Sequence, residues 1–153
     1  QIQNNYGQFL CRQGEFEMAD EQFIAAASNP VYSGRSGALT NAGTCAMQIP
    51  DLDKAEVYFR RALEADSKYL PALTRMAQLR YDQGNYVGAR GYIQRLEELS
   101  PLSPEILWLG VRVEDADGNY EASGRYALLL KNNFPDAMQT RSLQEWENER
   151  RNR

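Results

Sequence analysis

The sequence predicts an all-α fold, a right-handed superhelix of helix-turn-helix repeats. A turn residue recurs at a nearly constant distance, since Gly14, Pro50, Gly84 and Gly118 follow one another at intervals of 36, 34 and 34 residues. Apolar residues recur at three- and four-residue steps on both sides of each turn, which is the spacing of one face of a helix. A period of about 34 residues is typical of proteins in which helix pairs stack into a solenoid.

The segment from 70 to 101 shows the repeat most completely. Leu73, Met76 and Ala77 share one face of a first helix. Gly84 ends this helix, because glycine adopts a positive φ without strain. The inner stripe of the second helix consists of Tyr86, Ala89, Ile93 and Leu96. Small, large and aromatic residues at these offsets, followed by a proline, resemble the tetratricopeptide (TPR) repeat, whose small residues let the two helices approach closely.

The other units carry residues of the same kind at equivalent positions. Two places after the turn stand Phe16, Leu52, Tyr86 and Tyr120, and five places after it stand Ala19, Ala55, Ala89 and Ser123. The small residues of the first helices are Gly7, Gly43, Ala77 and, one place out of register, Gly110. Three units end at Pro30, Pro101 and Pro135. We therefore expect a single array with repeats at about 1–34, 36–69, 70–102 and 103–135.

The two ends of the array are expected to differ from its middle. Gln1 would already lie within the first helix, so we expect the chain to be part of a longer array whose N-terminal part is absent. After the last repeat the sequence becomes polar, with Met138, Leu143 and Trp146 at helical spacing. We expect a capping helix at about 136–150 that covers the apolar edge of the last repeat.

Charge and composition favour a protein-binding module over an enzyme or a nucleic-acid-binding protein. The net charge is −4, and Lys and Arg are scattered among Asp and Glu, so no basic stripe would attract nucleic acid. The chain contains no His, the commonest general base, and no glycine-rich phosphate loop. We therefore expect no catalytic residue, no cofactor and no metal site. No run of about 18 apolar residues occurs, and we expect a soluble chain.

The candidate partner-binding residues lie on the first helices, which line a concave groove in this fold. We chose the side of each first helix that turns away from its own second helix, by counting offsets. The set consists of Asn4, Gln8 and Arg12; Thr40, Thr44, Met47 and Gln48; Thr74, Gln78, Tyr81 and Asp82; and Trp108, Arg112 and Asp115. Amides, hydroxyls and aromatic rings suit an extended or helical peptide. Trp108 has a second interpretation, as part of the contact with the next helix.

Several local motifs resemble one TPR family in particular. They are Asn4-Asn5-Tyr6-Gly7 with Phe9-Leu10-Cys11, Asn41-Ala42-Gly43-Thr44-Cys45, Ala62-Leu63, Leu107-Trp108-Leu109 and Asn133-Phe134-Pro135. Together they look like the PilF or PilW proteins of type IV pilus biogenesis and stability. The resemblance implies a pilotin, which is a lipoprotein at the periplasmic face of the Gram-negative outer membrane. Such a protein helps the secretin subunit to reach that membrane and to assemble its multimer.

The resemblance also implies the partner, which is the secretin subunit, and attachment to the membrane only through a lipid on the absent N-terminus. We expect a monomer. Two alternatives stay open, of which one is a generic TPR scaffold or adaptor for an unknown peptide partner. The other is a TPR-regulated enzyme whose catalytic domain lies outside this sequence.

The two cysteines, Cys11 and Cys45, stand one repeat apart on the first helices of neighbouring units. First helices that pack side by side lie about 8 to 10 Å apart, so facing cysteines can come within the roughly 4.4 to 6.8 Å between Cα atoms that a disulfide tolerates. An envelope protein, as the resemblance implies, would meet an oxidising compartment. We predict a disulfide, and the alternative is two buried free thiols that act as small apolar fillers.

Overall fold

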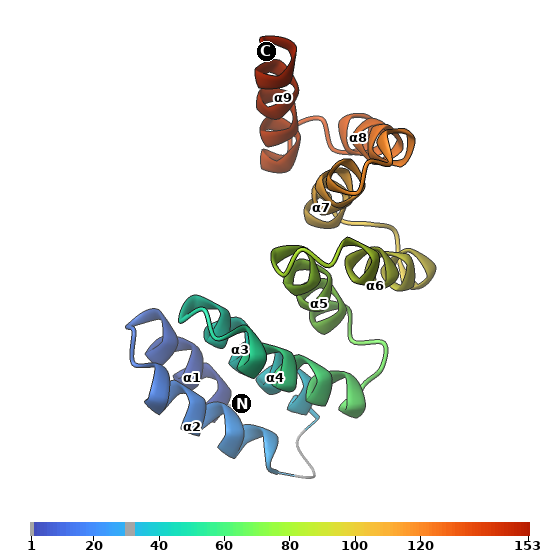
Figure 1. Ribbon diagram of the computed structural model, residues 1–153. Helices are drawn as coiled ribbons and strands as arrows, with labels where there is room; N and C mark the ends of the chain where they lie inside the picture. Colours follow the sequence, from blue (N-terminus) through green and yellow to red (C-terminus); the bar gives the residue numbers. More distant parts are fainter. Residues whose placement is uncertain (1, 30–32) are drawn as a thin grey trace. The chain divides into compact units, whose positions relative to one another are not determined.

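Nine helices make up the part of the chain that the structure, a computed structural model, describes: residues 2–29 and 33–153 (Figure 1). They are α1 (Ile2–Arg12), α2 (Phe16–Ala27), α3 (Arg35–Gln48), α4 (Leu52–Ala65), α5 (Leu70–Asp82), α6 (Tyr86–Leu99), α7 (Pro104–Ala116), α8 (Tyr120–Asn133) and α9 (Met138–Arg151). The expected all-α fold of successive helices joined by short turns is confirmed. Gln1 and Pro30, which the sequence assigns to a first helix and a unit end, lie outside the described residues.

The helices belong to two compact units, Gln1–Leu79 and Arg80–Arg153, and α5 runs from one into the other. In the first unit α1 packs on α2 and α3 packs on α4, and α3 also contacts both α1 and α2. In the second unit α7 packs on α8, α6 contacts α7, and α9 contacts α7 and α8. The first helices of the two pairs in the first unit, α1 and α3, therefore lie side by side (Figure 1).

Three turns between paired helices share one backbone geometry. Gly14, Gly84 and Gly118 have φ values of 80°, 75° and 78°, the left-handed region that glycine enters without steric cost. The turn before α4 uses Pro50 instead, and Asp51 caps the helix that follows. The Asp51 Oδ1 accepts a hydrogen bond from a backbone N–H one turn later at 3.1 Å, which satisfies one of the free donors at the start of α4.

Close approach of the paired helices depends on a glycine that faces an aromatic ring. A Cβ added to Gly7 of α1 would lie 2.7 Å from ring atoms of Phe23 on α2, and a Cβ added to Gly43 of α3 would collide with the ring of Phe59 on α4. Phe23 and Phe59 are both fully buried. Each ring therefore occupies the volume that a side chain on the first helix would need, and the missing Cβ allows the two backbones to come together.

The last pair uses the same contact one residue out of register. A Cβ added to Gly110 of α7 would lie 2.9 Å from the Tyr126 ring of α8. Gly110 stands eight places before its turn residue, Gly118, where Gly7 and Gly43 stand seven places before theirs, Gly14 and Pro50. Tyr126 stands eight places after the turn, where Phe23 and Phe59 stand nine after. Both partners have shifted by one place toward the N-terminus and stay 16 residues apart, as in the other two pairs, so the contact is kept.

The second unit contains a buried ion pair between α6 and α7. The Arg90 guanidinium donates from Nε to Glu114 Oε1 at 2.6 Å and from Nη2 to Glu114 Oε2 at 2.9 Å, and Nη2 also donates to Asp117 Oδ2 at 2.5 Å. Glu114 is almost completely buried. The hydrogen bonds to Glu114 and Asp117 raise the pKa of Arg90. A buried charge requires such a partner, so this bidentate pair fixes the position of α6 against α7.

The C-terminal helix α9 contacts both helices of the last pair, α7 and α8. Leu143 is fully buried, and Thr140 donates a hydrogen bond from its hydroxyl to the carbonyl oxygen of Phe134 at 2.5 Å. Lys131 of α8 pairs with Glu147 of α9 at 2.8 Å. Met138, which the sequence assigned to the apolar stripe, is instead 65% exposed, because it lies at the very start of the helix, five places before Leu143. Leu143 is therefore the main apolar anchor of α9.

A substitution of Gly43 by Ala tests the close approach of the paired helices. The new methyl group would collide with the buried Phe59 ring, and we expect the free energy of unfolding to fall by about 1–3 kcal/mol. Gly91→Ala is the matched control, because an added Cβ there meets nothing within 4 Å in the middle of α6. The control should raise the free energy of unfolding by about 0.5–1 kcal/mol. Urea unfolding followed by circular dichroism measures both, and equal effects would contradict the steric explanation.

A pair of substitutions in α9 tests its role as a cap. Leu143→Ala removes a fully buried side chain and should lower the free energy of unfolding of the second unit by about 2–5 kcal/mol. Met138→Ala truncates an exposed side chain of the same helix and should change it by less than about 0.5 kcal/mol. Thermal melting of the two variants decides the point. If Leu143→Ala has the same melting temperature as the wild type, α9 does not stabilise the unit that it contacts.

Candidate interaction surface

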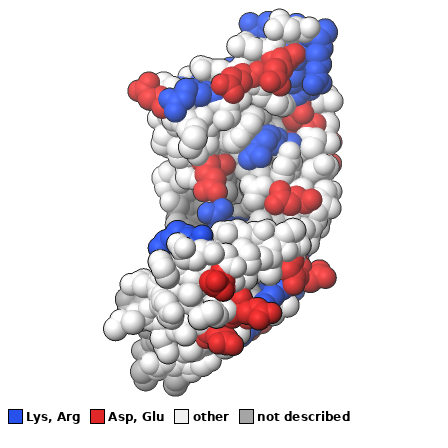
Figure 2. All heavy atoms as spheres, turned by 90° about the vertical axis from the view of Figure 1, so that its left-hand side faces the viewer, with Lys and Arg blue, Asp and Glu red and all other residues white. Residues whose placement is uncertain are grey.

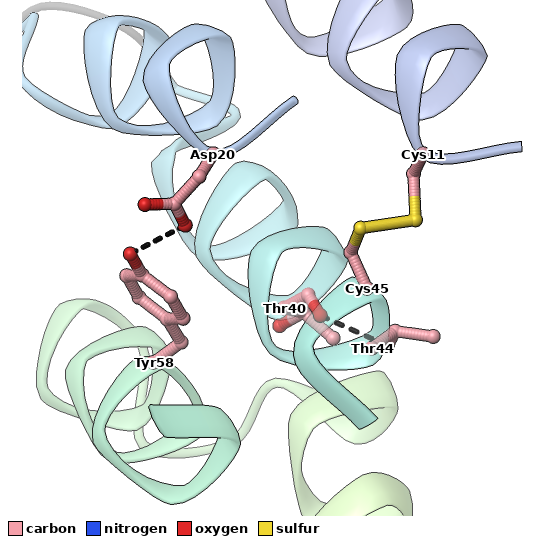
Figure 3. Close-up of a disulfide and its surroundings, with 6 residues drawn as sticks. All are labelled: Cys11, Asp20, Thr40, Thr44, Cys45 and Tyr58. Carbon is pink, nitrogen blue, oxygen red and sulfur yellow. Dashed lines mark hydrogen bonds between the residues drawn. A yellow bond between two sulfur atoms is a disulfide. The ribbon is translucent and has the colours of Figure 1, made fainter. Parts of the chain in front are cut away.

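A disulfide between Cys11 and Cys45 joins α1 to α3, the first helices of neighbouring pairs (Figure 3). The two Cα atoms are 6.0 Å apart, and the two residues are separated by 34 positions in the sequence. On the opposite side of α3, Tyr58 of α4 donates a hydrogen bond to Asp20 of α2 at 2.6 Å (Figure 3). Burial and this hydrogen bond raise the pKa of the Tyr58 hydroxyl. The disulfide and this hydrogen bond are thus among the connections that hold the pairs of the first unit together.

Two short rows of polar side chains flank the disulfide. Gln8 and Arg12 stand one turn apart on α1, and Thr44 and Gln48 stand one turn apart on α3. Between the rows lies a hollow of about 160 Å³. Its lining consists of Gln8, Cys11, Arg12, Phe23, Asn41, Thr44, Cys45 and Gln48. The structure thus brings four of the sequence-predicted binding residues, two from α1 and two from α3, around this hollow.

Two predicted binding residues of the first unit do not reach the surface. Asn4 is buried, and its Oδ1 accepts a hydrogen bond from Asn41 Nδ2 at 3.0 Å. Thr40 is also buried, and its hydroxyl donates to the carbonyl oxygen of Ser36 at 2.7 Å. Asn4 thus bonds across the contact between α1 and α3, and Thr40 bonds within its own helix. The prediction that Asn4 and Thr40 contact a partner is therefore corrected, and they are internal polar residues with satisfied hydrogen bonds.

The other predicted residues of the first unit have varied surroundings. Met47 is half-buried on α3 and does not line the hollow. Thr74 and Gln78 are half-buried and stand one turn apart on the part of α5 that belongs to the first unit. They remain candidates for contact with a partner.

In the second unit, Arg112 lies between two aromatic rings. Its Cζ is 5.3 Å from the centre of the Tyr81 ring and 4.8 Å from the centre of the Trp108 ring, and its Nε donates to the Trp108 carbonyl oxygen at 3.4 Å. Burial lowers the pKa of the guanidinium, and Tyr81, Asp82 and Glu105 raise it in part. Arginine stays charged at neutral pH in spite of such shifts. The two rings thus hold a cation in a fixed plane on the first-helix side of this unit.

Trp108 also contacts the C-terminal helix. Its ring meets the Trp146 ring edge-to-face, with centres 6.0 Å apart and an interplanar angle of 81°. Arg150 lies over Trp146 with its Cζ 4.4 Å from the ring centre, and its Nη1 donates to Asp115 Oδ1 at 2.6 Å. Of the two interpretations of Trp108, the structure therefore places its ring in the contact with the next helix. Asp115 is likewise engaged by α9, whereas Asp82 stays exposed.

Counting offsets missed Asn41, Trp146 and Arg150. Asn41 lines the hollow but stands one place from the chosen side of α3, and Trp146 and Arg150 lie on the capping helix, which has no second helix to count from. The signal that could have found Trp146 is its place in the apolar stripe of a polar helix. That signal predicts that Trp146 is buried, but it does not predict which residue the ring packs against.

The distribution of charged and apolar side chains limits what kinds of ligand the described surface can bind. In Figure 2 acidic and basic side chains are interspersed, most densely at the upper end that carries α9. Among the described residues, no group of His, Cys, Asp and Glu side chains is arranged to hold a metal ion. Within the same residues, each helix is too short or too polar to cross a bilayer. The features available for recognition on the described surface are thus charged groups of both signs, amides, hydroxyls and aromatic rings.

Comparison with known proteins shows to which proteins the chain is similar. The family model described as "Tetratricopeptide repeat" matches residues 50–108. The type IV pilus assembly protein PilF of Pseudomonas aeruginosa PAO1 is 27% identical over 143 residues, which is 94% of this chain. A crystal structure of PilW, a "widely conserved type IV pilus biogenesis factor", superposes with a TM-score of 0.83 at 29% identity over 94% of this chain. The chain is a TPR protein related to the type IV pilus assembly factors PilF and PilW.

The PilF/PilW family resemblance expected from the motifs and the TPR fold are thereby confirmed. The solved structure of Pseudomonas aeruginosa PilF is also similar, with a TM-score of 0.77 at 27% identity over 94% of this chain. The chain spans 57% of the PilF sequence and 66% and 65% of the solved PilW and PilF chains. A TPR protein from Parabacteroides merdae with a TM-score of 0.80 is only 19% identical, and it supports the fold alone.

Counting thiols tests the covalent link between α1 and α3. Protein denatured without reductant should contain no free thiol, and reduction should expose two. Because the bond closes a loop of 34 residues, its reduction should lower the free energy of unfolding by up to about 4 kcal/mol. Titration with a chromogenic thiol reagent, with the Cys11→Ser and Cys45→Ser double variant as the control without thiols, gives the count. Two free thiols before reduction would mean that the helices are not covalently joined.

Proposed function

We propose that this TPR array is a non-enzymatic protein-binding module that acts as a pilotin in type IV pilus assembly. In this role it promotes the outer-membrane localisation of the secretin subunit and the assembly of its multimer. The observation that carries the proposal is the similarity to PilF and PilW, which extends over 94% of this chain. Because the chain spans only part of these relatives, the activity of the whole protein is part of the proposal.

The chemistry of the first-helix surfaces supports recognition of a protein. Arginine and tyrosine are enriched among the residues that dominate protein–protein binding, and the half-buried Tyr81 and Arg112 combine the two types. The cation is held against the ring before binding, so a partner would not have to order it. Trp108 contributes to this surface mainly by keeping Arg112 in place, because its own ring packs on Trp146.

The proposed location follows from the proposed role. A pilotin works at the periplasmic face of the outer membrane, and in this proposal a lipid on an N-terminal segment outside the given sequence supplies the attachment. The proposed partner is a segment of the secretin subunit bound by a monomeric TPR protein. The array itself would carry the partner-binding surface.

The full-length protein in its host tests the proposal. Deletion of the gene should reduce the amount of secretin multimer in the outer-membrane fraction, and the wild-type gene should restore it. Purified full-length protein should also retain the secretin in a pull-down from outer-membrane extract. Tyr81→Ala should weaken this binding by roughly 2 kcal/mol, because it removes one of the two groups proposed as anchors.

Tyr120→Ala is the matched control for this experiment. Tyr120 belongs to the same unit but lies on α8 and is 67% exposed, so its loss should leave both binding and multimer assembly unchanged. A deletion strain with normal secretin multimers, together with a pull-down that retains no secretin, would contradict the pilotin role. The chain would then be a TPR adaptor for another partner.

A further inference from the structure

The hollow beside the disulfide has the size and the lining of a pocket for one side chain. Its volume of about 160 Å³ is well below the roughly 300–1,000 Å³ of pockets that hold cofactors or drug-sized ligands. Cys11, Cys45 and Phe23 expose 7%, 6% and 1% of their surfaces, so they form its floor. Sulfur atoms and an aromatic ring give this floor an apolar, polarisable character. Such a floor favours an aliphatic side chain.

The walls of the hollow carry hydrogen-bonding groups that the protein itself does not use. Within residues 2–29 and 33–153, the structure gives the side chains of Gln8, Arg12 and Gln48 no hydrogen-bond or ion-pair partner. Each glutamine amide offers a donor and an acceptor, which match the N–H and C=O groups of an extended peptide. By contrast, the Thr44 hydroxyl already donates to the carbonyl oxygen of Thr40 at 2.9 Å. The available groups are thus on both sides of the hollow, on α1 and on α3.

The charge of the lining favours an acidic ligand. Arg12 is the one charged residue among the eight that line the hollow, and none of them carries a carboxylate. A guanidinium without an internal partner can hold a carboxylate through two parallel hydrogen bonds. The disulfide holds the Cα atoms of Cys11 on α1 and Cys45 on α3 at a distance of 6.0 Å. The two polar rows therefore keep their spacing before any partner binds.

We propose that this hollow binds an extended segment of a protein partner, with one aliphatic side chain on the floor of Cys11, Cys45 and Phe23. The glutamines Gln8 and Gln48 hold the main chain of that segment, and Arg12 binds the carboxylate of an acidic residue next to the aliphatic one. The inference deepens the proposed function. It rests on the chain being a protein-binding module, and it does not require that the partner be the secretin.

A random peptide library displayed on phage and selected on the oxidised protein tests the inference. The selected peptides should carry Asp or Glu within two positions of an aliphatic residue. Calorimetric titration with a synthetic selected peptide should show binding at least about tenfold weaker for Arg12→Gln, which removes the charge at an exposed position. Thr44→Leu, which fills the hollow from its wall, should cause a similar loss.

Arg141→Gln is the matched control, because it removes one exposed positive charge from α9 in the other unit. It should leave peptide binding within about twofold of the wild type. In nuclear magnetic resonance spectra of the wild type, the side-chain amide signals of Gln8 and Gln48 should shift on peptide addition. Thr44→Leu and Arg12→Gln should melt near the wild-type temperature, which separates lost binding from lost folding.

Three outcomes would overturn the inference: a selection that enriches no peptide, enriched peptides without an acidic residue, or equal binding to Arg12→Gln and the wild type. Competition with the purified periplasmic part of the secretin keeps the two proposals apart. A selected peptide that binds as described but does not compete with the secretin supports the pocket and counts against the secretin as its partner. A pocket that fails while the pull-down still retains the secretin leaves the proposed function intact.

Discussion

The contact between a glycine and an aromatic ring inside the α1/α2, α3/α4 and α7/α8 pairs determines much of this structure. Where Gly7 meets Phe23 and Gly43 meets Phe59, no Cβ separates the two backbones, and the ring fills the space between them. The glycine and the aromatic residue are only 16 positions apart in the sequence. These helix pairs therefore form largely from local contacts. The orientation of a first helix toward its second helix is thereby set, and with it the row of side chains that the first helix presents on the other side. In this way a packing constraint determines which residues can meet a partner.

Connections between the pairs are more specific than the contacts within them. In the first unit they are covalent and polar, through the Cys11–Cys45 disulfide and the Tyr58–Asp20 hydrogen bond. The second unit uses the buried Arg90–Glu114 pair. Removal of one partner of a buried ion pair is costly because the other charge is left without compensation. The side-chain rows of the candidate interaction surface therefore lie on helices whose spacing is fixed before binding, which lowers the entropy lost when a partner is held.

The repeat was predictable from the sequence because its signals recur: turn glycines, small residues and aromatic residues at one period. The family was predictable because local motifs around both cysteines are specific. The exposure of individual side chains was less predictable. Asn4 and Thr40 have the offsets of groove residues but are buried, because offsets describe one helix and not the neighbour that packs on it. The shift of Gly110 seemed an irregularity in the sequence, and only the position of Tyr126 explains it, since both residues move together. The role of Trp146 against Trp108 needed the position of α9 as well.

A double-mutant cycle at Gly43 and Phe59 tests whether the missing Cβ of the first helix makes room for the ring of the second. In the wild-type background the methyl group of Gly43→Ala has no space. In the Phe59→Leu background the ring is gone, and the same methyl group should cost much less free energy of unfolding. We expect a favourable coupling of at least about 1 kcal/mol between the two substitutions, measured by urea unfolding. Additive effects, with Gly43→Ala equally destabilising in both backgrounds, would contradict it.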